Sequence, residues 1–386
     1  MKLPVAISLG VLSASASAEP LRLRADALAQ AESPAGLLVL EADGQARENV
    51  SAEAVVWMAG AEDDNEGDVL VIAVRANALS GRANARLGRF VSTLGALRAA
   101  HVDGGAFRVR LPHSFDVEAV AGVPVMPGLG TSRSWDWLAG GRVSRRLGDS
   151  GSVGVAYAQR RDVGMLVTEE IGVDAGVEIT KRDDVGARAA YDVANPGIAE
   201  IALTASHRGK SVRTEAYAIH REASHLLPAT SLFSVIGDVP SQRAGAVFTW
   251  RAAPRLDVIA DTGARKIDDD YGVELVGRAR LRLDDRGTSM LGGEVRRSGV
   301  ADDEWTGLRG TARVALGRGF TASTELELVI PDVDRGRGRV WPWVLGAVSW
   351  ECDDWQAAIA AEASASSEYS SRFDVLGQLA RRWGRK

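Results

Sequence analysis

Apolar and polar side chains alternate along most of the chain, from about Leu21 to Trp383. Near the C-terminus, Phe373, Val375 and Leu379 take every second position and mostly polar residues lie between them. Two further runs of this kind are Ala244, Ala246, Phe248 and Trp250, and Leu308, Gly310, Ala312, Val314 and Leu316. A period of two places the two sets on opposite faces of a β-strand. Because no helical pattern interrupts the alternation, the sequence predicts an all-β protein.

The alternating runs are bounded by Gly, Pro, Asp, Asn and Ser, and they give up to 22 candidate strands. The predicted starts lie near residues 21, 36, 51, 67, 84, 104, 115, 136, 151, 170, 184, 197, 211, 242, 255, 272, 291, 306, 320, 340, 355 and 372. Charges break every apolar run, so no transmembrane helix is expected after the N-terminus, but a barrel strand needs only about 9–11 residues to cross. We therefore expect a closed antiparallel transmembrane β-barrel with an even strand number, between 16 and 22.

The predicted connections alternate in length. Every second connection is short, and these lie at residues 47–50, 112–114, 147–150, 208–210, 253–254, 317–319 and 351–354. The connections between them are on average longer, notably 92–104, 124–135, 222–240 and 331–339. Outer-membrane barrels have short periplasmic turns and longer extracellular loops. The alternation therefore predicts which end of the barrel faces the periplasm and places the long connections outside.

The N-terminal 18 residues have the features of a secretory signal peptide. Lys2 provides a positive charge, an apolar stretch follows, and the small residues Ala16 and Ala18 form an A-x-A cleavage site. We expect residues 1–18 to be removed and residues 19–386 to form a single barrel domain in the bacterial outer membrane.

Nine tryptophans lie near predicted strand ends, which is where amphipathic indoles form girdles at the membrane interfaces. They are Trp135, Trp137, Trp250, Trp305, Trp341, Trp343, Trp350, Trp355 and Trp383. With this feature the chain resembles the porin-like outer-membrane β-barrels of Gram-negative bacteria. The final run, Arg372 to Trp383, is similar to the closing strand that barrel-assembly machinery recognises, although three residues follow Trp383. The resemblance implies outer-membrane lipid and that machinery as partners.

If the apolar positions face lipid, charged residues at the alternate positions face the lumen. The predicted pore-lining residues are Asp257, Asp261, Arg278, Arg280, Arg282, Glu294, Arg309, Arg313, Glu325 and Glu327. Pairing adjacent strands through their turns predicts one row at similar depth, made of Asp257, Arg280, Glu294, Arg309 and Glu327. Such a wall could filter solutes by charge. It could equally be a neutralised wall that only holds the barrel open.

Other chemistry finds little support. The chain has 46 basic and 51 acidic residues without a basic block, so no nucleic-acid partner is expected. The single cysteine, Cys352, makes neither an internal disulfide nor a metal site, and the acidic run 62–66 lacks the spacing of a calcium loop. His220 and His225 beside Ser224 are best explained as solvated loop residues. We expect no enzymatic activity, no cofactor and no metal.

Three functions compete. The first is a water-filled transport or export channel, for example for polysaccharide, because barrels of 16 or more strands leave an aqueous lumen. The second is a non-conducting scaffold barrel of an envelope complex for motility, adhesion or secretion, with other envelope proteins as partners. The third is a soluble secreted all-β protein, whose many small outward residues would form a poor core between two sheets. We favour the channel.

Overall fold

The computed structural model describes residues 21–31, 35–61, 64–125, 136–222, 240–267, 269–300, 303–332, 340–368 and 370–384. The predicted signal peptide lies outside these ranges. The described strands are β1 (Arg22–Gln30), β2 (Ala35–Arg47), β3 (Val50–Ala61), β4 (Asp64–Ala78), β5 (Ala83–Ser92), β6 (Ala100–Arg110), β7 (Phe115–Pro124), β8 (Trp137–Leu147), β9 (Gly151–Asp162), β10 (Met165–Thr180), β11 (Asp183–Asp192), β12 (Gly197–Arg208), β13 (Val212–Arg221), β14 (Ser241–Ala253), β15 (Leu256–Ile267), β16 (Asp270–Arg282), β17 (Met290–Val300), β18 (Asp303–Gly317), β19 (Phe320–Pro331), β20 (Trp341–Cys352), β21 (Trp355–Ser364) and β22 (Arg372–Trp383). The one helical turn in these ranges is η1 (Pro112–Ser114).

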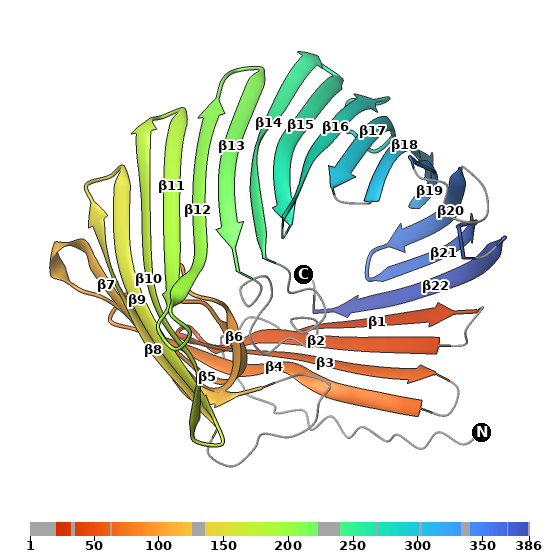
Figure 1. Ribbon diagram of the computed structural model, residues 1–386. Coiled ribbons are helices and arrows are strands. Elements are labelled where there is room, and N and C mark those ends of the chain that lie inside the picture. The colour runs from red at the N-terminus through yellow and green to blue at the C-terminus, as the bar shows by residue number, and fades with distance from the viewer. Residues whose placement is uncertain are drawn as a thin grey trace.

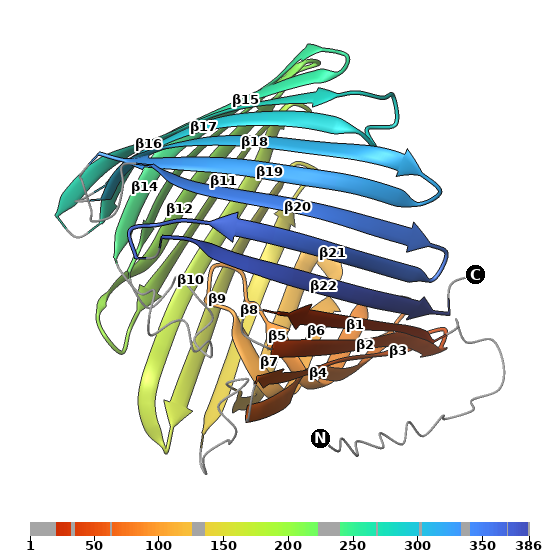
Figure 2. The ribbon, with the colours of Figure 1, turned by 90° about the vertical axis from the view of Figure 1, so that its right-hand side faces the viewer.

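The 22 strands form a single closed sheet. Each strand pairs antiparallel with the next in sequence, and β22 pairs with β1 from Leu23↔Trp383 to Gln30↔Leu376. Figure 1 shows the strands following one another around a ring, and Figure 2 shows β22 beside β1 where the ring closes. The predicted fold class and even strand number are confirmed. Among the described residues no helix is long and apolar enough to cross a membrane.

All 22 candidate strands are present, and most begin close to their predicted starts. The largest difference is β10, which was expected near residue 170 and begins at Met165. Its connection to β9 is the two-residue turn Val163-Gly164, in which φ is 51° and 78°. Positive φ at both central residues is typical of the tight hairpin turn that matches strand twist. β10 therefore begins closer to the turn than the sequence predicted.

The connections sort by parity as predicted. Those that follow even-numbered strands are mostly two to four residues long, as at 48–49, 148–150 and 353–354. The longest connections, at 125–136, 222–240 and 332–340, follow odd-numbered strands, as do those at 93–99 and 365–371. The exception is the connection at 283–289, which is as long as the last two and follows β16. β1 begins and β22 ends at the end of the barrel that carries the short connections. We call this the short-turn end and the opposite one the long-loop end.

One face of the sheet carries large apolar side chains that no other part of the described protein covers. On adjacent strands Val295, Leu308 and Leu326 are 52%, 41% and 48% exposed. A monomeric soluble protein rarely exposes so continuous an apolar surface. The alternate positions carry the charges, and a closed sheet turns that second face inward. The barrel thus has an apolar outer face and a charged lumen, which excludes the soluble two-sheet arrangement.

Aromatic side chains surround the outer face at the short-turn end. Phe320 and Trp350 lie with ring centroids 6.4 Å apart, and the Arg381 guanidinium lies 4.6 Å from the Trp355 ring and 4.8 Å from the Trp383 ring. This arrangement agrees with the predicted interfacial girdle. The prediction is wrong for Trp305, Trp341 and Trp343, whose pairing with Ser298, Val329 and Glu327 places them on the inner face at the long-loop end. Trp135 lies outside the described residues.

Side chains complete the wall where β4 and β5 separate. The two strands pair only from Ile72↔Arg89 to Ala78↔Ala83, so residues 64–71 of β4 have no backbone partner on β5. The Arg89 guanidinium fills this position: it donates to the Val69 carbonyl at 2.9 Å and forms ion pairs with Asp68 at 3.0 Å and Asp103 at 2.7 Å. An edge strand inside a closed wall would otherwise leave carbonyl groups unpaired.

Candidate functional site: the barrel lumen

All ten predicted pore-lining residues lie on the inner face. Asp257 pairs with Arg280, and Glu294 pairs with Arg278 on one side and with Arg309 on the other. Arg309 in turn pairs with Glu327. The same registers carry Asp261, Arg282, Arg313 and Glu325 on this face. The assignment of faces from the sequence is therefore correct for β15 to β19.

The predicted single row of charges is wrong. Arg280 lies opposite Gly292, not Glu294, which is two residues deeper along β17. The five residues are divided between two neighbouring rows: Asp257 and Arg280 lie in the row nearer the short turns, and Glu294, Arg309 and Glu327 in the next one. A shift of two residues keeps every side chain on its face and changes only its depth.

Ion pairs hold the deeper row together. Glu294 is nearly buried and accepts hydrogen bonds from both Arg278 and Arg296. The Arg296 guanidinium also lies 3.5 Å from Glu327. Arg309 approaches Glu325 to 2.5 Å. Most guanidinium groups of this wall are thus neutralised by carboxylates on adjacent strands, as the alternation of signs in the sequence indicated.

The connection between β5 and β6 folds into the lumen. We call residues 93–99 the lumen segment. Leu94 and Leu97 are each 6% exposed, and they pack with Phe90, Val102 and other apolar inner-face residues of β5 to β12. The sequence predicted a long connection here and placed it with the other long ones. It does start at the long-loop end, but its inward turn was not predicted.

Small residues on the wall make room for the lumen segment. A Cβ atom added to Gly140 of β8 would lie 2.8 Å from Leu94 Cδ1, and one added to Gly172 of β10 would lie 2.7 Å from Leu97 Cδ2. The two leucines therefore fit into places that any larger residue would fill. Glycines in strands often mark such close approaches, and this was the only local signal for the contact.

A charged triad borders the same contact. The Arg142 guanidinium forms ion pairs with Asp174 at 2.6 Å and with Glu118 at 3.0 Å. Gly95 of the lumen segment adopts φ +57° directly beside this cluster, where an added Cβ would lie 2.3 Å from Asp174 Oδ1. Apolar packing and a fixed polar border thus hold the segment against the β8–β10 side of the lumen, leaving the charged β13–β22 side uncovered by it.

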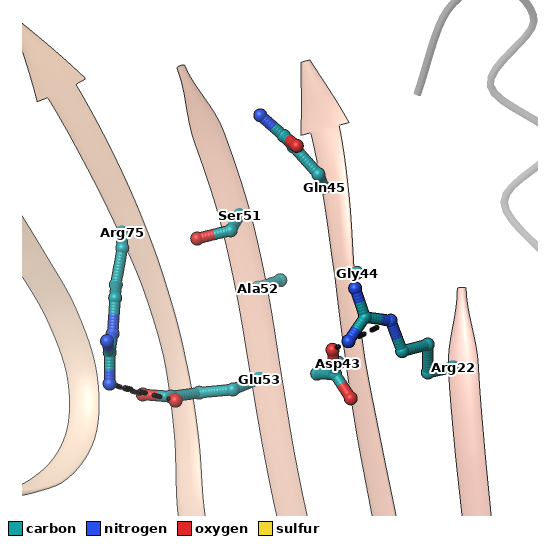
Figure 3. A pocket seen from close by; sticks show the side chains of 8 residues that line it. All are labelled: Arg22, Asp43, Gly44, Gln45, Ser51, Ala52, Glu53 and Arg75. Carbon is teal, nitrogen blue, oxygen red and sulfur yellow. Dashed lines mark hydrogen bonds and ion pairs between the residues drawn. The ribbon is translucent and has the colours of Figure 1, made fainter. Parts of the chain in front are cut away.

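At the short-turn end, three inner-face carboxylates each hold two arginines. The pairs are Arg75 and Arg86 on Glu53, Arg108 and Arg110 on Asp116, and Arg251 and Arg282 on Asp257. Figure 3 shows the Arg75 side of the first group, with Arg75 directed at Glu53, and also Arg22 directed at Asp43 on neighbouring strands. We call these three groups arginine clamps. Each carries one net positive charge.

The described residues contain no metal-binding constellation. Within these ranges no three His, Cys, Asp or Glu side chains are arranged to hold a metal ion. His220 lies 3.6 Å from Glu222 at the end of β13. Ser224 and His225 lie outside the described residues, as do residues 62–63 of the acidic run.

Several solved structures share this architecture. The siderophore receptor PirA from Pseudomonas aeruginosa matches with a TM-score of 0.62 and 8% identity over 95% of this chain and 80% of that one. A structure of the ferric enterobactin receptor PfeA matches with a TM-score of 0.63 and 8% identity over 94% and 81%. The translocation pore of the P pilus usher PapC matches with a TM-score of 0.54 and 10% identity over 95% and 99%. At these identities the likeness shows the fold alone.

The chain therefore has the fold of Gram-negative outer-membrane β-barrels, and the resemblance expected from the sequence is confirmed at that level. No protein-family profile matches the sequence, and a search of curated proteins found no match.

Proposed function

We propose that the protein is a water-filled transport or export channel of the bacterial outer membrane, delivered there after removal of the 1–18 signal peptide. The observation that supports this most is the composition of the inner wall. Arginines and carboxylates line it on consecutive strands, and such charges are tolerated where water reaches them but not in an apolar interior. Barrels of 16 or more strands leave room for that water.

The limited filling of the lumen also favours conduction. Many 22-stranded outer-membrane transporters have a plugged lumen. In this chain the described ranges are almost entirely barrel strands and their connections, and the described segment that packs inside is 93–99. Within the described residues, this seven-residue segment packs against one side of the lumen and leaves the opposite wall uncovered. The proposed channel is thus constricted at the β8–β10 side and open along the charged side.

Residence in the membrane carries further proposals about partners. The outer apolar face would contact lipid, and the C-terminal strand β22, which ends at Trp383, would be read by barrel-assembly machinery. One similar structure is described as a P pilus tip assembly intermediate, PapC-PapD-PapK-PapG, at a TM-score of 0.56 and 10% identity. By analogy of fold only, other envelope proteins could work with this barrel at its mouths.

The test is conductance of the purified, detergent-solubilised protein in planar lipid bilayers. We expect stepwise current increases as single barrels insert. A parallel assay should show heat modifiability on gels, since a folded barrel migrates differently before and after boiling. Folded protein that inserts into bilayers without conducting would reject the channel and leave the scaffold function in its place. Recovery as a soluble monomer without detergent would reject both.

A further inference from the structure

The arginine clamps are part of a wider imbalance of charge between the two ends of the lumen. Three inner-face arginines of the described residues, Arg146, Arg280 and Arg313, have no carboxylate within ion-pair distance. All three lie at the short-turn end. The clamps on Glu53, Asp116 and Asp257 lie at the same end. Positive charge therefore exceeds negative charge around this mouth.

The long-loop end has the opposite balance. Glu66, Asp162, Asp192, Glu362 and Asp374 lie on the inner face within five residues of a connection at the long-loop end. Two carboxylates there, Glu200 and Glu274, each hold two arginines in the way the clamps do. Even with these, described carboxylates outnumber arginines at that end. The lumen is thus basic at one mouth and acidic at the other.

Two of the three unpaired arginines, Arg280 and Arg313, lie on β16 and β18. Arg280 pairs across the strands with Gly292, which pairs with Thr311, and Arg313 follows Thr311 on the same face of β18. Gly292 has no side chain, and a Cβ there would lie 2.4 Å from the Thr311 hydroxyl oxygen. The Thr311 hydroxyl therefore occupies the space over Gly292, and the two exposed arginines lie on the strands on either side of β17. Two carboxylates lie in register beside these residues: Asp257, opposite Arg280, already holds Arg251 and Arg282, and Glu325, opposite Thr311, already holds Arg309.

We propose that Arg280, Arg313 and Thr311 form an anion-binding site at the short-turn mouth, and that the channel takes up anionic solutes there. This rests on the proposed function and adds its substrate class. Guanidinium groups bind carboxylate and phosphate oxygens through paired, charge-assisted hydrogen bonds. In an exported anionic polymer, acidic groups would meet the basic mouth first and be released toward the acidic one. A channel with a uniform wall would lack this direction.

The experiment measures block of the single-channel current by inorganic tripolyphosphate and, separately, by a short polyglutamate, each added to one side of the bilayer at a time. We expect both to block more strongly from one side, and more weakly as salt rises and screens the site. The double variant Arg280→Gln/Arg313→Gln should weaken block from that side by about tenfold or more, as expected for losing two charged hydrogen-bond donors.

Arg265→Gln is the matched control. It removes one positive charge from the inner face at the long-loop end, where Arg243 still holds Glu274 at 3.1 Å. This control should leave the stronger block unchanged. Equal block from both sides, or equal loss in the control and the double variant, would overturn the anion site while leaving the channel intact.

A direct binding measurement separates the two proposals. Titration of tripolyphosphate into detergent-solubilised protein should show binding that the double variant loses and Arg265→Gln retains. If the protein binds tripolyphosphate in this way but never conducts, the channel fails and the anion site stands. If it conducts but does not bind, the site fails. Arg280 and Arg313 are exposed and unpaired, and Glu274 keeps its ion pair with Arg243 when Arg265 is replaced, so both variants should fold and remain heat-modifiable.

Discussion

Replacing Gly172 by a larger residue should displace the lumen segment without unfolding the barrel. In Gly172→Val the new Cβ would lie 2.7 Å from Leu97 Cδ2 and 3.2 Å from Ala96 Cβ, well inside contact distance. Overpacking of this kind costs about 1–3 kcal/mol. Burial of the Leu97 side chain is worth about 1.5–3 kcal/mol. The free-energy cost of overpacking is thus comparable to the cost of exposing Leu97. We therefore expect the lumen segment to leave the wall in this variant.

Gly176→Val is the matched control. Gly176 lies four residues further along β10 on the same inner face, and its added Cβ would meet nothing nearer than Ser152 Oγ at 3.9 Å. We expect Gly172→Val alone to give a larger and noisier open-channel current, and trypsin to cleave it faster after Arg98 of the lumen segment. The same current and the same cleavage rate in both variants would refute the docking of Leu97 against Gly172.

Three further outcomes test the faces, the ends and one turn of the barrel. Leu308→Arg, at mid-height on the outer face, should lower the free energy of unfolding in lipid by about 2–4 kcal/mol, whereas Thr311→Arg in the lumen should cost far less in the same denaturant titration; similar costs would invert the faces. An epitope inserted at Asn195 should be reachable on intact cells and one at Pro254 should not, and the reverse pattern would invert the ends. The Asp284 carboxylate accepts hydrogen bonds from the Thr288 hydroxyl and from two amides of the turn before β17, which together hold its pKa far below the usual range. The stabilisation is present above the ordinary carboxyl pKa and is lost only as pH falls through the lowered pKa of Asp284. Hydrogen exchange should therefore show those amides protected in mildly acidic buffer. They should be unprotected in an Asp284→Asn variant.

The face of each strand could be predicted from the sequence because an error of one residue would place the apolar side chains in the lumen and the charged ones in lipid. Moving Arg309 to the outer face would move Leu308 into the lumen and expose the whole alternation as wrong. All ten expected pore-lining residues accordingly lie inside. The girdle tryptophans were less secure, since position at a strand end does not define a face. Trp305 shares the parity of Arg309, so its inward direction could have been recognised from the sequence.

Depth along the barrel was harder to predict. A shift of two residues leaves every face unchanged, so the alternation cannot distinguish Gly292 from Glu294 as the partner of Arg280. The turn from residue 283 to residue 289 decides it, and its length depends on hydrogen bonds from Thr288 and Ser289 to Asp284. Local sequence alone gives no unique choice among such turns.

The lumen segment could not be predicted because its contacts are distant in sequence. Leu97 meets Gly172, and Leu94 meets Gly140, across three or more strands. Glycine in a β-strand has several explanations, including a bulge or a tight bend. Only the closed barrel brings these glycines opposite two leucines of a connection that was grouped with the external loops because of its length.

The outer and inner faces of the barrel wall differ in which substitutions they tolerate. Exchange of an outer residue such as Leu308 for a charge meets lipid and costs several kcal/mol, so that face is fixed by the membrane. Exposed ion pairs such as Arg309 with Glu325 contribute only about 0–1 kcal/mol each. Stability therefore does not explain why the unpaired arginines gather at one mouth, because the fold would tolerate them anywhere along the lumen. A distribution that folding leaves open is most simply set by what passes through the barrel.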